Sequence, residues 1–435
     1  MPRRTSFMAF QLLPPREQIA ETLARIYRGG MTTTSGGNLS IRDESGAIWI
    51  TPRGVDKGAM TAQDMVCIRP DGTHEGLHQA SSEYPFHKAI YEQRPDLQAI
   101  IHAHPSALVS FSIVRKTPYT DIIAQAHKIC GKIGYAPYAV PGTEALGQSI
   151  AQSFAEGFNA VIMENHGTVV GGTSLLEAYH RFESLEFCAR TQLNATRIGQ
   201  VKRLSEAQCA LVDHQEHQLP EQTRVEHPAN ERALRREICN FVQRACQQGL
   251  MISTYGTMSA RWQGNDFIIT PTGVDRRYLQ VDDLVQIKNG QREAGKLPSR
   301  SVLTHAAIYR QHPHIQSIIV TQPPHALAFA ISDQVFDTRT IPESYLLLKD
   351  VPRIPFDEHF GGNSPITETL SATHPIVLIE NDSILVTGKS VLDAFDRLEV
   401  AEFSARSIID AKALGTIAPM GDEAIADLKK HFPHL

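Results

Sequence analysis

The amino-acid sequence predicts two tandem copies of one α/β fold, and three observations support this. The first is length, because 435 residues correspond to about two or three domains at roughly 150 residues each. The second is a repeat: residues 50–56 read Ile-Thr-Pro-Arg-Gly-Val-Asp and residues 269–275 read Ile-Thr-Pro-Thr-Gly-Val-Asp. The third is that segments with helical spacing alternate with short apolar runs of the strand type. A repeat on this scale indicates a duplicated fold.

The repeat continues along both halves at almost constant spacing. The offset is 219 at residues 50–56, 218 between His87 and His305, and 216 between Glu164 and Glu380. A drift of only three residues over this distance means that few residues have been inserted or lost. We therefore expect both halves to fold in the same way.

The first half begins with an amphipathic helix and two strands. Ile19, Leu23 and Ile26 recur at helical spacing. Strands are expected to follow at residues 37–42 and 47–51.

The remainder of the half predicts helices around buried strands. A helix is expected at 84–93, because Pro85 is tolerated in a first helical turn. Apolar runs at 97–102 and 160–163 are typical of buried strands. A helix over 175–193 closes the half.

The boundary between the halves is predicted from composition. Residues 213–230 are polar and show no periodicity, which indicates a linker. We therefore expect a first domain at residues 1–212 and a second domain at residues 231–435.

Charge and composition exclude several classes of function. The chain carries 42 Lys+Arg against 47 Asp+Glu, and this net charge of -5 argues against a nucleic-acid binder. No apolar stretch reaches the roughly 18 residues that span a membrane, so no membrane partner is expected. Two arginines near the N-terminus are not followed by an apolar region, so no signal peptide is expected. Six cysteines without a CxxC pair predict free thiols and a cytoplasmic location.

A pair of histidines follows a predicted strand in the first half. Residues two apart on a strand project to the same face, so His102 and His104 could reach one metal ion. With 19 histidines in the chain, chance alone gives roughly 0.8 such patterns. A second one, His312 and His314, falls in a predicted loop where no metal is expected.

Two further residues could complete a metal site. His166 follows the predicted strand at 160–163, and Glu83 begins the helix at 84–93. Three histidines and a carboxylate form a plausible shell for a divalent metal such as catalytic zinc. Spacing alone leaves a metal site and a chance arrangement both open.

Glycines and hydroxyl groups form a second set of candidates. The turn at residues 35–38 contains two glycines that would let backbone N–H groups approach an anion. Arg53 offers a charge after a strand, and Ser81 and Ser82 stand where a helix begins, a position that favours phosphate. Each feature alone is more typical of an ordinary turn or helix cap, and the three together favour phosphate binding.

These residues resemble the class II aldolase/adducin family over essentially all of the first half. The resemblance implies a three-layer α/β/α fold with a central, mainly antiparallel sheet in each copy. The segments that carry it are Gly37-Asn38-Leu39-Ser40, Ile50-Thr51-Pro52-Arg53-Gly54, Ser81-Ser82-Glu83, His102-Ala103-His104-Pro105, Ala136-Pro137-Tyr138 and Glu164-Asn165-His166-Gly167.

The resemblance also implies roles for individual residues. One zinc ion per chain would be bound by His102, His104 and His166, with Glu83 as the fourth ligand and as the acid/base group. Substrate phosphate would be bound by Gly37, Asn38, Thr51, Gly54, Ser81 and Ser82. Arg53 departs from the smaller residue usual in the family, which suggests an additional anionic group on the substrate.

The implied activity is retro-aldol cleavage of a phosphorylated ketose to dihydroxyacetone phosphate, or an analogue, and an aldehyde. Glutamate at position 83 is typical of the aldolase branch, whereas the epimerase branch tends to carry aspartate. Three alternatives stay open. They are decarboxylation of a 3-oxo sugar-acid phosphate, sugar-phosphate 4-epimerisation and a non-catalytic, adducin-like interaction role.

The proton donor departs from the family pattern. Family aldolases use a tyrosine from a neighbouring subunit, and the equivalent position falls near Ile122. Tyr119 and Tyr135 stand nearby in the sequence. Tyr345 of the second half is the remaining candidate.

The second half has lost the metal ligands. At the positions of Glu83, His102, His104 and His166 it carries Ser301, Val320, Gln322 and Asp382. We therefore expect a degenerate domain that folds but binds no catalytic zinc. Because family aldolases form four-fold rings, a homo-oligomer is expected, with a dimer of this chain imitating such a ring.

Overall fold

The computed structural model describes residues 10–212, 219–360 and 365–432. Their contacts divide the chain into two compact units. The N-terminal unit contains residues 10–120 and 126–190, and the C-terminal unit contains residues 121–125 and the described residues from 191 onward. Each unit is built on its own sheet.

The N-terminal unit contains an eight-stranded sheet in the order β4-β3-β2-β1-β5-β8-β7-β6. Every neighbouring pair is antiparallel except β6 and β7, which are parallel. The strands are β1 (Asn38–Arg42), β2 (Ile48–Ile50), β3 (Val66–Ile68), β4 (His74–Glu75), β5 (Ala99–Ala103), β6 (Gly134–Ala136), β7 (Ala160–Met163) and β8 (Thr168–Gly172).

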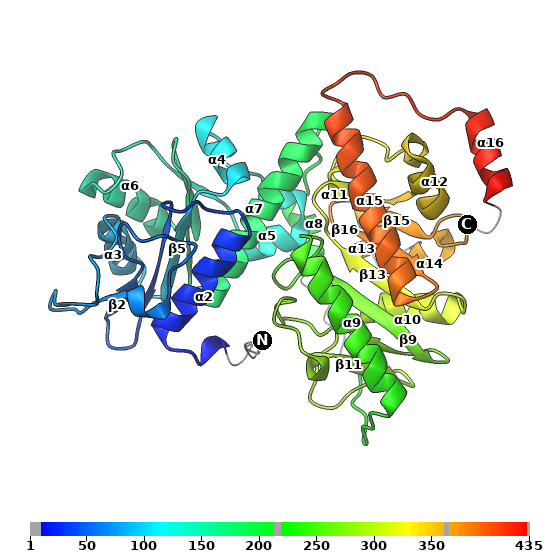
Figure 1. Ribbon diagram of the computed structural model, residues 1–435, viewed down its shortest axis with the longest axis horizontal. Helices are drawn as coiled ribbons and strands as arrows, with labels where there is room; N and C mark the ends of the chain where they lie inside the picture. The colour runs from blue at the N-terminus through cyan, green and yellow to red at the C-terminus, as the bar shows by residue number, and fades with distance from the viewer. Residues whose placement is uncertain (1–9, 213–218, 361–364, 433–435) are drawn as a thin grey trace. The chain divides into compact units, whose positions relative to one another are not determined.

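Helices cover both faces of this sheet (Figure 1). The helices are α2 (Pro15–Arg28), α3 (Tyr84–Gln93), α4 (Ser106–Ile113), α5 (Ala124–Cys130), α6 (Glu144–Ala155) and α7 (Leu175–Ile198), with a 3-10 turn η2 (Thr120–Ile122). Phe86 of α3 and Phe154 of α6 pack on Ile100, Val161 and Val169 of the sheet. In Figure 1, α2 and α7 lie on the other face, so the unit has three layers.

The C-terminal unit repeats this topology strand for strand. Its sheet has the order β12-β11-β10-β9-β13-β16-β15-β14, and β14 and β15 form its one parallel pair. The strands are β9 (Thr257–Gln263), β10 (Asp266–Ile269), β11 (Val285–Lys288), β12 (Gln291–Arg292), β13 (Ser317–Thr321), β14 (Arg353–Ile354), β15 (Ile376–Ile379) and β16 (Ser383–Gly388).

The helices of the C-terminal unit are arranged in the same way. The helices are α8 (Glu206–Leu211), α9 (Ala229–Gln247), α10 (Val302–Gln311), α11 (Ala326–Ala330), α12 (Pro342–Leu348), α13 (Phe356–Phe360), α14 (Ile366–Thr369), α15 (Val391–Ala411) and α16 (Asp422–His431), with 3-10 turns η4 (Val281–Asp283) and η5 (Thr338–Thr340). Tyr309 of α10 and Ile366 of α14 pack on one face of the sheet. Helices α9 and α15 contact β9 and β16 and cover the other face (Figure 1). The predicted three-layer α/β/α fold with a mainly antiparallel sheet is confirmed in both halves.

The helix predicted at 84–93 and the strand predicted at 160–163 are present with those bounds, and the other predicted elements differ at their ends. The strand predicted at 97–102 is β5, which begins at Ala99 because the backbone N–H of Leu97 still closes a turn on Arg94 O. Helix α7 continues to Ile198, five residues beyond the predicted 175–193.

The predicted linker at 213–230 is partly structured. Residues 213–218 lie outside the described residues, and the helix α9 already begins at Ala229. Between them, the backbone of Gln222 donates to Arg292 O and Pro220 O accepts from the N–H of Arg292. These residues therefore line the edge strand β12 of the C-terminal unit.

All six cysteines lie among the described residues, are buried and form no disulfide there, which agrees with the prediction of free thiols. Among the described residues, no helix combines the length and the apolar character that a membrane span requires.

Candidate active site

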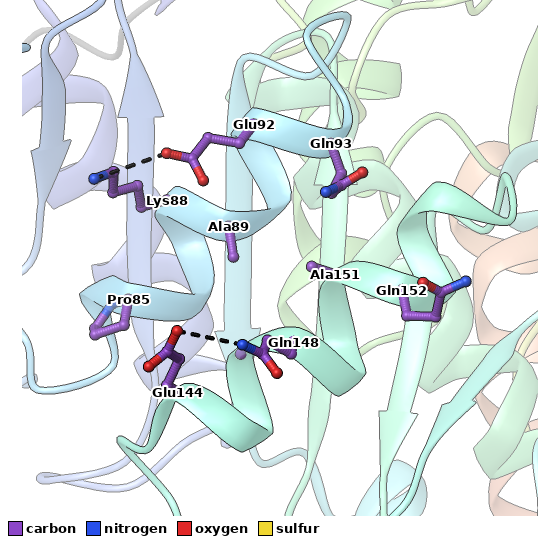
Figure 2. Close-up of a pocket in the computed structure, with 10 residues that line it drawn as sticks. Pro85, Lys88, Ala89, Glu92, Gln93, Glu144, Gln148, Ala151 and Gln152 are labelled. Carbon is purple, nitrogen blue, oxygen red and sulfur yellow. Dashed lines mark hydrogen bonds and ion pairs between the residues drawn. The ribbon is translucent and has the colours of Figure 1, made fainter.

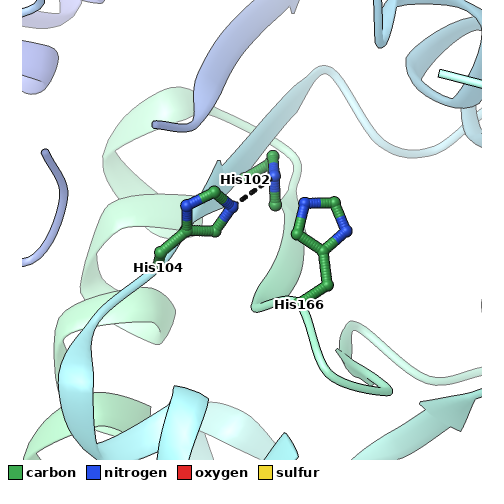
Figure 3. Close-up of side chains that lie close together, drawn as sticks. All are labelled: His102, His104 and His166. Atoms are coloured by element: carbon green, nitrogen blue, oxygen red, sulfur yellow. Dashed lines mark hydrogen bonds between the residues drawn. The ribbon is translucent and has the colours of Figure 1, made fainter. Parts of the chain in front are cut away.

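Three histidines of the N-terminal unit converge at one end of its sheet (Figure 3). His102 lies on β5, His104 follows that strand, and His166 lies in the turn between β7 and β8. Their potential ligand atoms all lie within 4.8 Å of one another. The Nε2 atoms of His102 and His104 are 3.1 Å apart. Three imidazole nitrogens at this spacing could share one metal ion.

His102 is oriented by the sheet itself. Its side chain is completely buried, and Nδ1 donates a hydrogen bond to Thr168 O of the neighbouring strand β8 at 3.0 Å. This contact leaves the lone pair on Nε2, which faces the other two rings. Burial holds the pKa of His102 well below its ordinary value, and burial also lowers the pKa of His104 and of His166. Neutral imidazoles are the form that binds a metal.

Glu83 brings a carboxylate to the three histidines. It is the N-cap residue of α3, and its Oε2 lies 3.3 Å from His102 Nε2. Its Oε1 lies 3.7 Å from His166 Nε2. The donor set therefore contains three nitrogens and a carboxylate, which suits a catalytic divalent metal such as zinc.

A buried network that the sequence analysis missed holds Glu83 in place. The amide of Asn38 donates from Nδ2 to Glu83 Oε2 at 2.6 Å, and its Oδ1 lies 2.5 Å from His87 Nε2. The other nitrogen of His87 lies 2.7 Å from Ser40 Oγ. His87 is fully buried, and burial lowers its pKa to about 3, so the ring is neutral. His87 recurs as His305 in the repeat, and this recurrence was the signal for it in the sequence.

Glycines allow the chain to wrap closely around the histidines. Gly37 has a φ of +74°, and a Cβ atom there would lie 2.5 Å from His102 O. A Cβ atom on Gly167 would lie 2.6 Å from the ring of His104. Any larger residue at these two positions would displace the metal-site histidines.

The residues predicted to bind phosphate are brought together beside Glu83. Pro52 pairs with Ala80 in an isolated antiparallel bridge, and the N–H of Ser81 donates to Thr51 O at 3.2 Å. Ser81 Oγ in turn accepts from the N–H of Glu83 at 3.3 Å. The loop after β2 and the start of α3 therefore lie side by side, as a shared anion site requires.

The members of this loop pair differ in exposure. Thr51 is fully buried, and its hydroxyl accepts from the N–H of Leu39. Ser82, Arg53 and Gly54 are exposed. Arg53 is held through its backbone N–H, which donates to Gln79 O, so its guanidinium is available to a bound molecule.

Lys57 is a second residue that the sequence analysis missed. Only 4% of it is exposed, and its Nζ donates to Pro52 O at 3.2 Å. Burial lowers the pKa of Lys57 to about 8, and the nearby charge of Glu83 opposes this shift. The ammonium group therefore contacts the predicted phosphate loop and lies within electrostatic range of Glu83. The repeat carries another cation, Arg276, at the equivalent position, and this recurrence could have identified Lys57 from the sequence.

The candidate proton donors are distributed over both units. Tyr119 is exposed, whereas Tyr135 lies in β6 with its hydroxyl buried near Glu164. Ile122, which stands near the family tyrosine, is fully buried and belongs to the C-terminal unit. Tyr345 lies in α12 of the same unit, is 8% exposed, and its ring faces the ammonium of Lys429 at 5.8 Å.

The four substituted positions of the C-terminal unit occupy places equivalent to the ligands. Ser301 is the N-cap of α10, Val320 lies on β13, and Asp382 lies in the turn between β15 and β16. The Oε1 atom of Gln322 is buried and has no hydrogen-bond partner among the described residues. In the part of the chain that the structure describes, the three histidines are the only such cluster of possible metal ligands.

The ends of the first half pack beside these substituted positions, within the C-terminal unit. Asn381, next to Asp382, donates from Nδ2 to Ile122 O at 2.9 Å and to Lys202 O at 3.0 Å. Arg300, next to Ser301, contacts the side chain of Gln125. Residues 121–125 and the segment that follows α7 therefore contact the neighbours of two of the substituted positions.

A surface groove of about 580 Å³ lies between α3 and α6 (Figure 2). Lys88 and Glu92 form an ion pair on one side of it, and Glu144 and Gln148 form a hydrogen bond on the other. None of the predicted site residues lines this groove.

Comparison with known proteins gives two consistent results. The family model described as the class II aldolase and adducin N-terminal domain matches residues 17–193 and, separately, residues 236–409. The chain is 31% identical over 195 residues to the 5-deoxy-D-ribulose 1-phosphate aldolase of Bacillus thuringiensis serovar kurstaki. The aligned region covers 44% of this chain and 90% of that protein.

Two other relatives are similar to a comparable degree. The L-fuculose phosphate aldolase of Escherichia coli is 30% identical over 196 residues, covering 45% of this chain and 90% of the relative. The 3-oxo-tetronate 4-phosphate decarboxylase of Haemophilus influenzae is 28% identical over 185 residues, covering 41% of this chain and 86% of the relative.

Proposed function

The chain belongs to the class II aldolase and adducin family, and from this premise we propose that it is a zinc-dependent aldolase. Its reaction would be the retro-aldol cleavage of a phosphorylated ketose to dihydroxyacetone phosphate, or an analogue, and an aldehyde. The observation that carries this proposal is the convergence of His102, His104 and His166 with the carboxylate of Glu83. Aldolase activity among the relatives also supports it.

The residues of this site divide into three tasks. The three histidines and Glu83 would hold the metal, which when bound would act as a Lewis acid on substrate oxygens. Glu83 would also move the proton at the carbon that gains or loses the bond, because it is the carboxylate nearest the cluster. The residues proposed for the phosphate (Gly37, Asn38, Thr51, Arg53, Gly54, Ser81 and Ser82) would position the substrate.

Asn38 orients the carboxylate of Glu83 for that proton transfer. Its Nδ2 occupies one oxygen, Oε2, which leaves Oε1 as the less encumbered acceptor. The neutral, buried ring of His87 fixes the Asn38 amide from the other side. We propose that this network keeps the carboxylate aimed at the substrate when it leaves the metal.

A decarboxylase acting on a 3-oxo sugar-acid phosphate is the second candidate. The exposed guanidinium of Arg53 beside the phosphate loop could hold a substrate carboxylate, and one relative is named as such a decarboxylase. A 4-epimerase and a non-catalytic adducin-like role are the remaining alternatives. A non-catalytic protein would not need the complete set of possible metal ligands in the first half, which argues against the adducin-like role.

A substrate panel separates these functions. The zinc-loaded protein would be incubated with phosphorylated ketoses and 3-oxo sugar-acid phosphates, and aldehyde, CO2 and epimer would be measured. We expect aldehyde together with dihydroxyacetone phosphate. Release of CO2 in place of aldehyde would refute the aldolase proposal, and a protein that binds no metal would favour the adducin-like role.

We propose that the active form is an oligomer in which a second chain completes the site. Within the C-terminal unit, residues 121–125 and the segment after α7 contact Asn381, the neighbour of the substituted position Asp382. By the internal repeat, η5, α12 and the segment after α15 would cover the intact site of another chain, with Tyr345 as the candidate proton donor. A fully active monomer, measured by light scattering at assay concentration, would refute this arrangement.

A further inference from the structure

The buried ammonium of Lys57 lacks a partner of opposite charge. Its only hydrogen-bond acceptor among the described residues is Pro52 O, and no carboxylate lies within ion-pair distance of its Nζ there. Lysine has three N–H donors, so two remain unused. Burying a charge without a counter-ion is unfavourable, and proteins accept this cost where a ligand supplies the counter-ion.

The repeat shows what a purely structural cation looks like at this position. Lys57 and Arg276 are equivalent, because the N–H of Lys57 donates to Thr34 O and the N–H of Arg276 donates to Ser253 O. Arg276 is also buried, at 2% exposure. However, its guanidinium donates to Gly256 O and Val274 O, both at 2.7 Å. The two cations therefore differ in their contacts: Arg276 donates to two backbone carbonyls, and Lys57 donates to one.

The surroundings of Lys57 indicate which kind of ligand its ammonium group could bind. Its acceptor, Pro52, stands between Thr51 and Arg53 in the loop proposed for the phosphate. Glu83, whose charge acts on Lys57, lies at the start of α3, and its backbone N–H donates to Ser81 Oγ. The ammonium is therefore placed where the phosphate loop meets the metal ligands.

We propose that Lys57 is a further substrate-binding residue, whose ammonium donates hydrogen bonds to the phosphate group of the substrate. This inference rests on the proposed function in that it places a phosphorylated substrate in this loop. It adds a charged residue to a set otherwise made of backbone groups, hydroxyls and the exposed Arg53. It also assigns the missing counter-charge to the substrate, so the ion pair forms only in the complex.

The test compares Lys57→Met with Arg276→Met in the full, zinc-loaded chain, using inorganic phosphate as the probe in calorimetry. We expect Lys57→Met to weaken phosphate binding by about tenfold to a hundredfold, the range of a charge-assisted hydrogen bond. Its metal content and melting temperature should be maintained or raised, because an unpaired buried charge is removed. Lys57→Arg should retain part of the affinity.

Arg276→Met is the matched control and should behave in the opposite way. It should lower the melting temperature, because Gly256 O and Val274 O lose their donors, while phosphate binding stays within twofold of the wild type. If Lys57→Met does not fold, Lys57→Gln replaces it. Phosphate affinity within twofold of the wild type in the folded variant would overturn the proposal.

The outcome is separable from that of the proposed function. Turnover of the substrate panel by the wild-type protein decides the reaction, and it does not depend on the Lys57 variants. A wild-type protein that binds phosphate but turns over no ketose would refute the aldolase and still support Lys57, provided that Lys57→Met binds phosphate more weakly. A wild-type protein that binds no phosphate would overturn the assignment of Lys57.

Discussion

At the scale of single residues, Glu83 has more tasks than any other group of the site. It lies beside two histidines and accepts from Asn38 Nδ2. We expect Glu83→Gln to lower kcat/KM by about a hundredfold to ten-thousandfold, because an amide cannot take the proton. The side-chain oxygen remains for Asn38, so the fold should be kept.

The equivalent position of the degenerate half supplies the control for Glu83. Ser301→Ala changes the N-cap of α10 and should leave kcat/KM within twofold of the wild type. Both variants would be assayed on the substrate that the panel identifies, with circular dichroism as a check of folding. Activity of Glu83→Gln within tenfold of the wild type would show that another group moves the proton.

A second residue-scale effect concerns stability against acid. Burial lowers the pKa of His305 to about 3, whereas an unfolded histidine titrates near 6.5. The unfolded chain therefore binds a proton below pH 6.5 that the folded chain does not bind. Stability should fall as pH decreases from 6.5 toward 3, by about 1.4 kcal/mol per pH unit for this histidine.

Urea unfolding at pH 7.5, 6.5 and 5.5 measures this slope. His305→Gln should reduce it by one proton, whereas His431→Gln, at an exposed position of α16, should leave it unchanged. An unaltered slope in His305→Gln would mean that the ring is protonated in the folded state.

At the scale of elements, the junction between β1 and β5 depends on Gly37. A Cβ atom there would clash with His102 O, and its φ of +74° is unfavourable for alanine. Gly273 has nearly the same φ, +72°, but no atom within 4 Å of such a Cβ. In Gly273→Ala, the φ value alone should lower the free energy of unfolding by about 1–3 kcal/mol. Gly37→Ala should lower it by more, because the clash is added.

Thermal unfolding and metal analysis check the prediction for Gly37. Because β5 carries His102, metal content should fall in Gly37→Ala and stay unchanged in Gly273→Ala. Equal losses of stability, with full metal content in both variants, would show that the strand absorbs the clash.

The elements that the sequence predicted well are those whose apolar residues face one sheet. The helix at 84–93 was predicted with its observed bounds because Pro85 marks its first turn and Phe86 and Ile90 are buried on one side. Helix α7 was predicted too short because its buried spacing continues through Ala195 and Ile198. The sequence contains no stop signal at residue 193 that could have ended it.

Other features could not be predicted because they depend on residues that are distant in the chain. The loop of Lys57 is held by the backbone of Thr34, whose carbonyl accepts from the N–H of Lys57. The contact between Asn381 and Ile122 joins positions 259 residues apart. The three histidines could be named from the resemblance, whereas the amide that orients Glu83 became visible only in three dimensions.

At the scale of the molecule, the second half forms hydrogen bonds with segments of the first half that belong to the C-terminal unit. Asn381 is 3% exposed and donates to two carbonyls of the first half's chain within the C-terminal unit. Asn381→Ala should lower the free energy of unfolding by about 1–3 kcal/mol beyond the effect of Asn165→Ala. The two asparagines have similar positive φ values, 51° and 53°, so backbone strain cancels in the comparison.

Urea unfolding at neutral pH measures both asparagine variants. A loss no larger in Asn381→Ala than in Asn165→Ala would mean that these two hydrogen bonds contribute nothing to stability.

The metal content of the whole chain tests the inequality of the halves. We expect about one zinc ion per chain by elemental analysis. His102→Ala with His104→Ala should remove it, because two of three nitrogen ligands are lost. Gln322→Ala with Asp382→Ala changes the equivalent places of the second half and should leave the content unchanged. Two ions per chain would contradict a degenerate second site.

The identical strand order of the two sheets has a consequence for how the two copies can evolve. In a ring of identical chains, every mutation is expressed at every site at once, so a change useful at one contact is imposed on all others. Two copies within one gene are free of that constraint. Ile122 and Ser301 could diverge here without altering their counterparts, and selection could act on each copy separately.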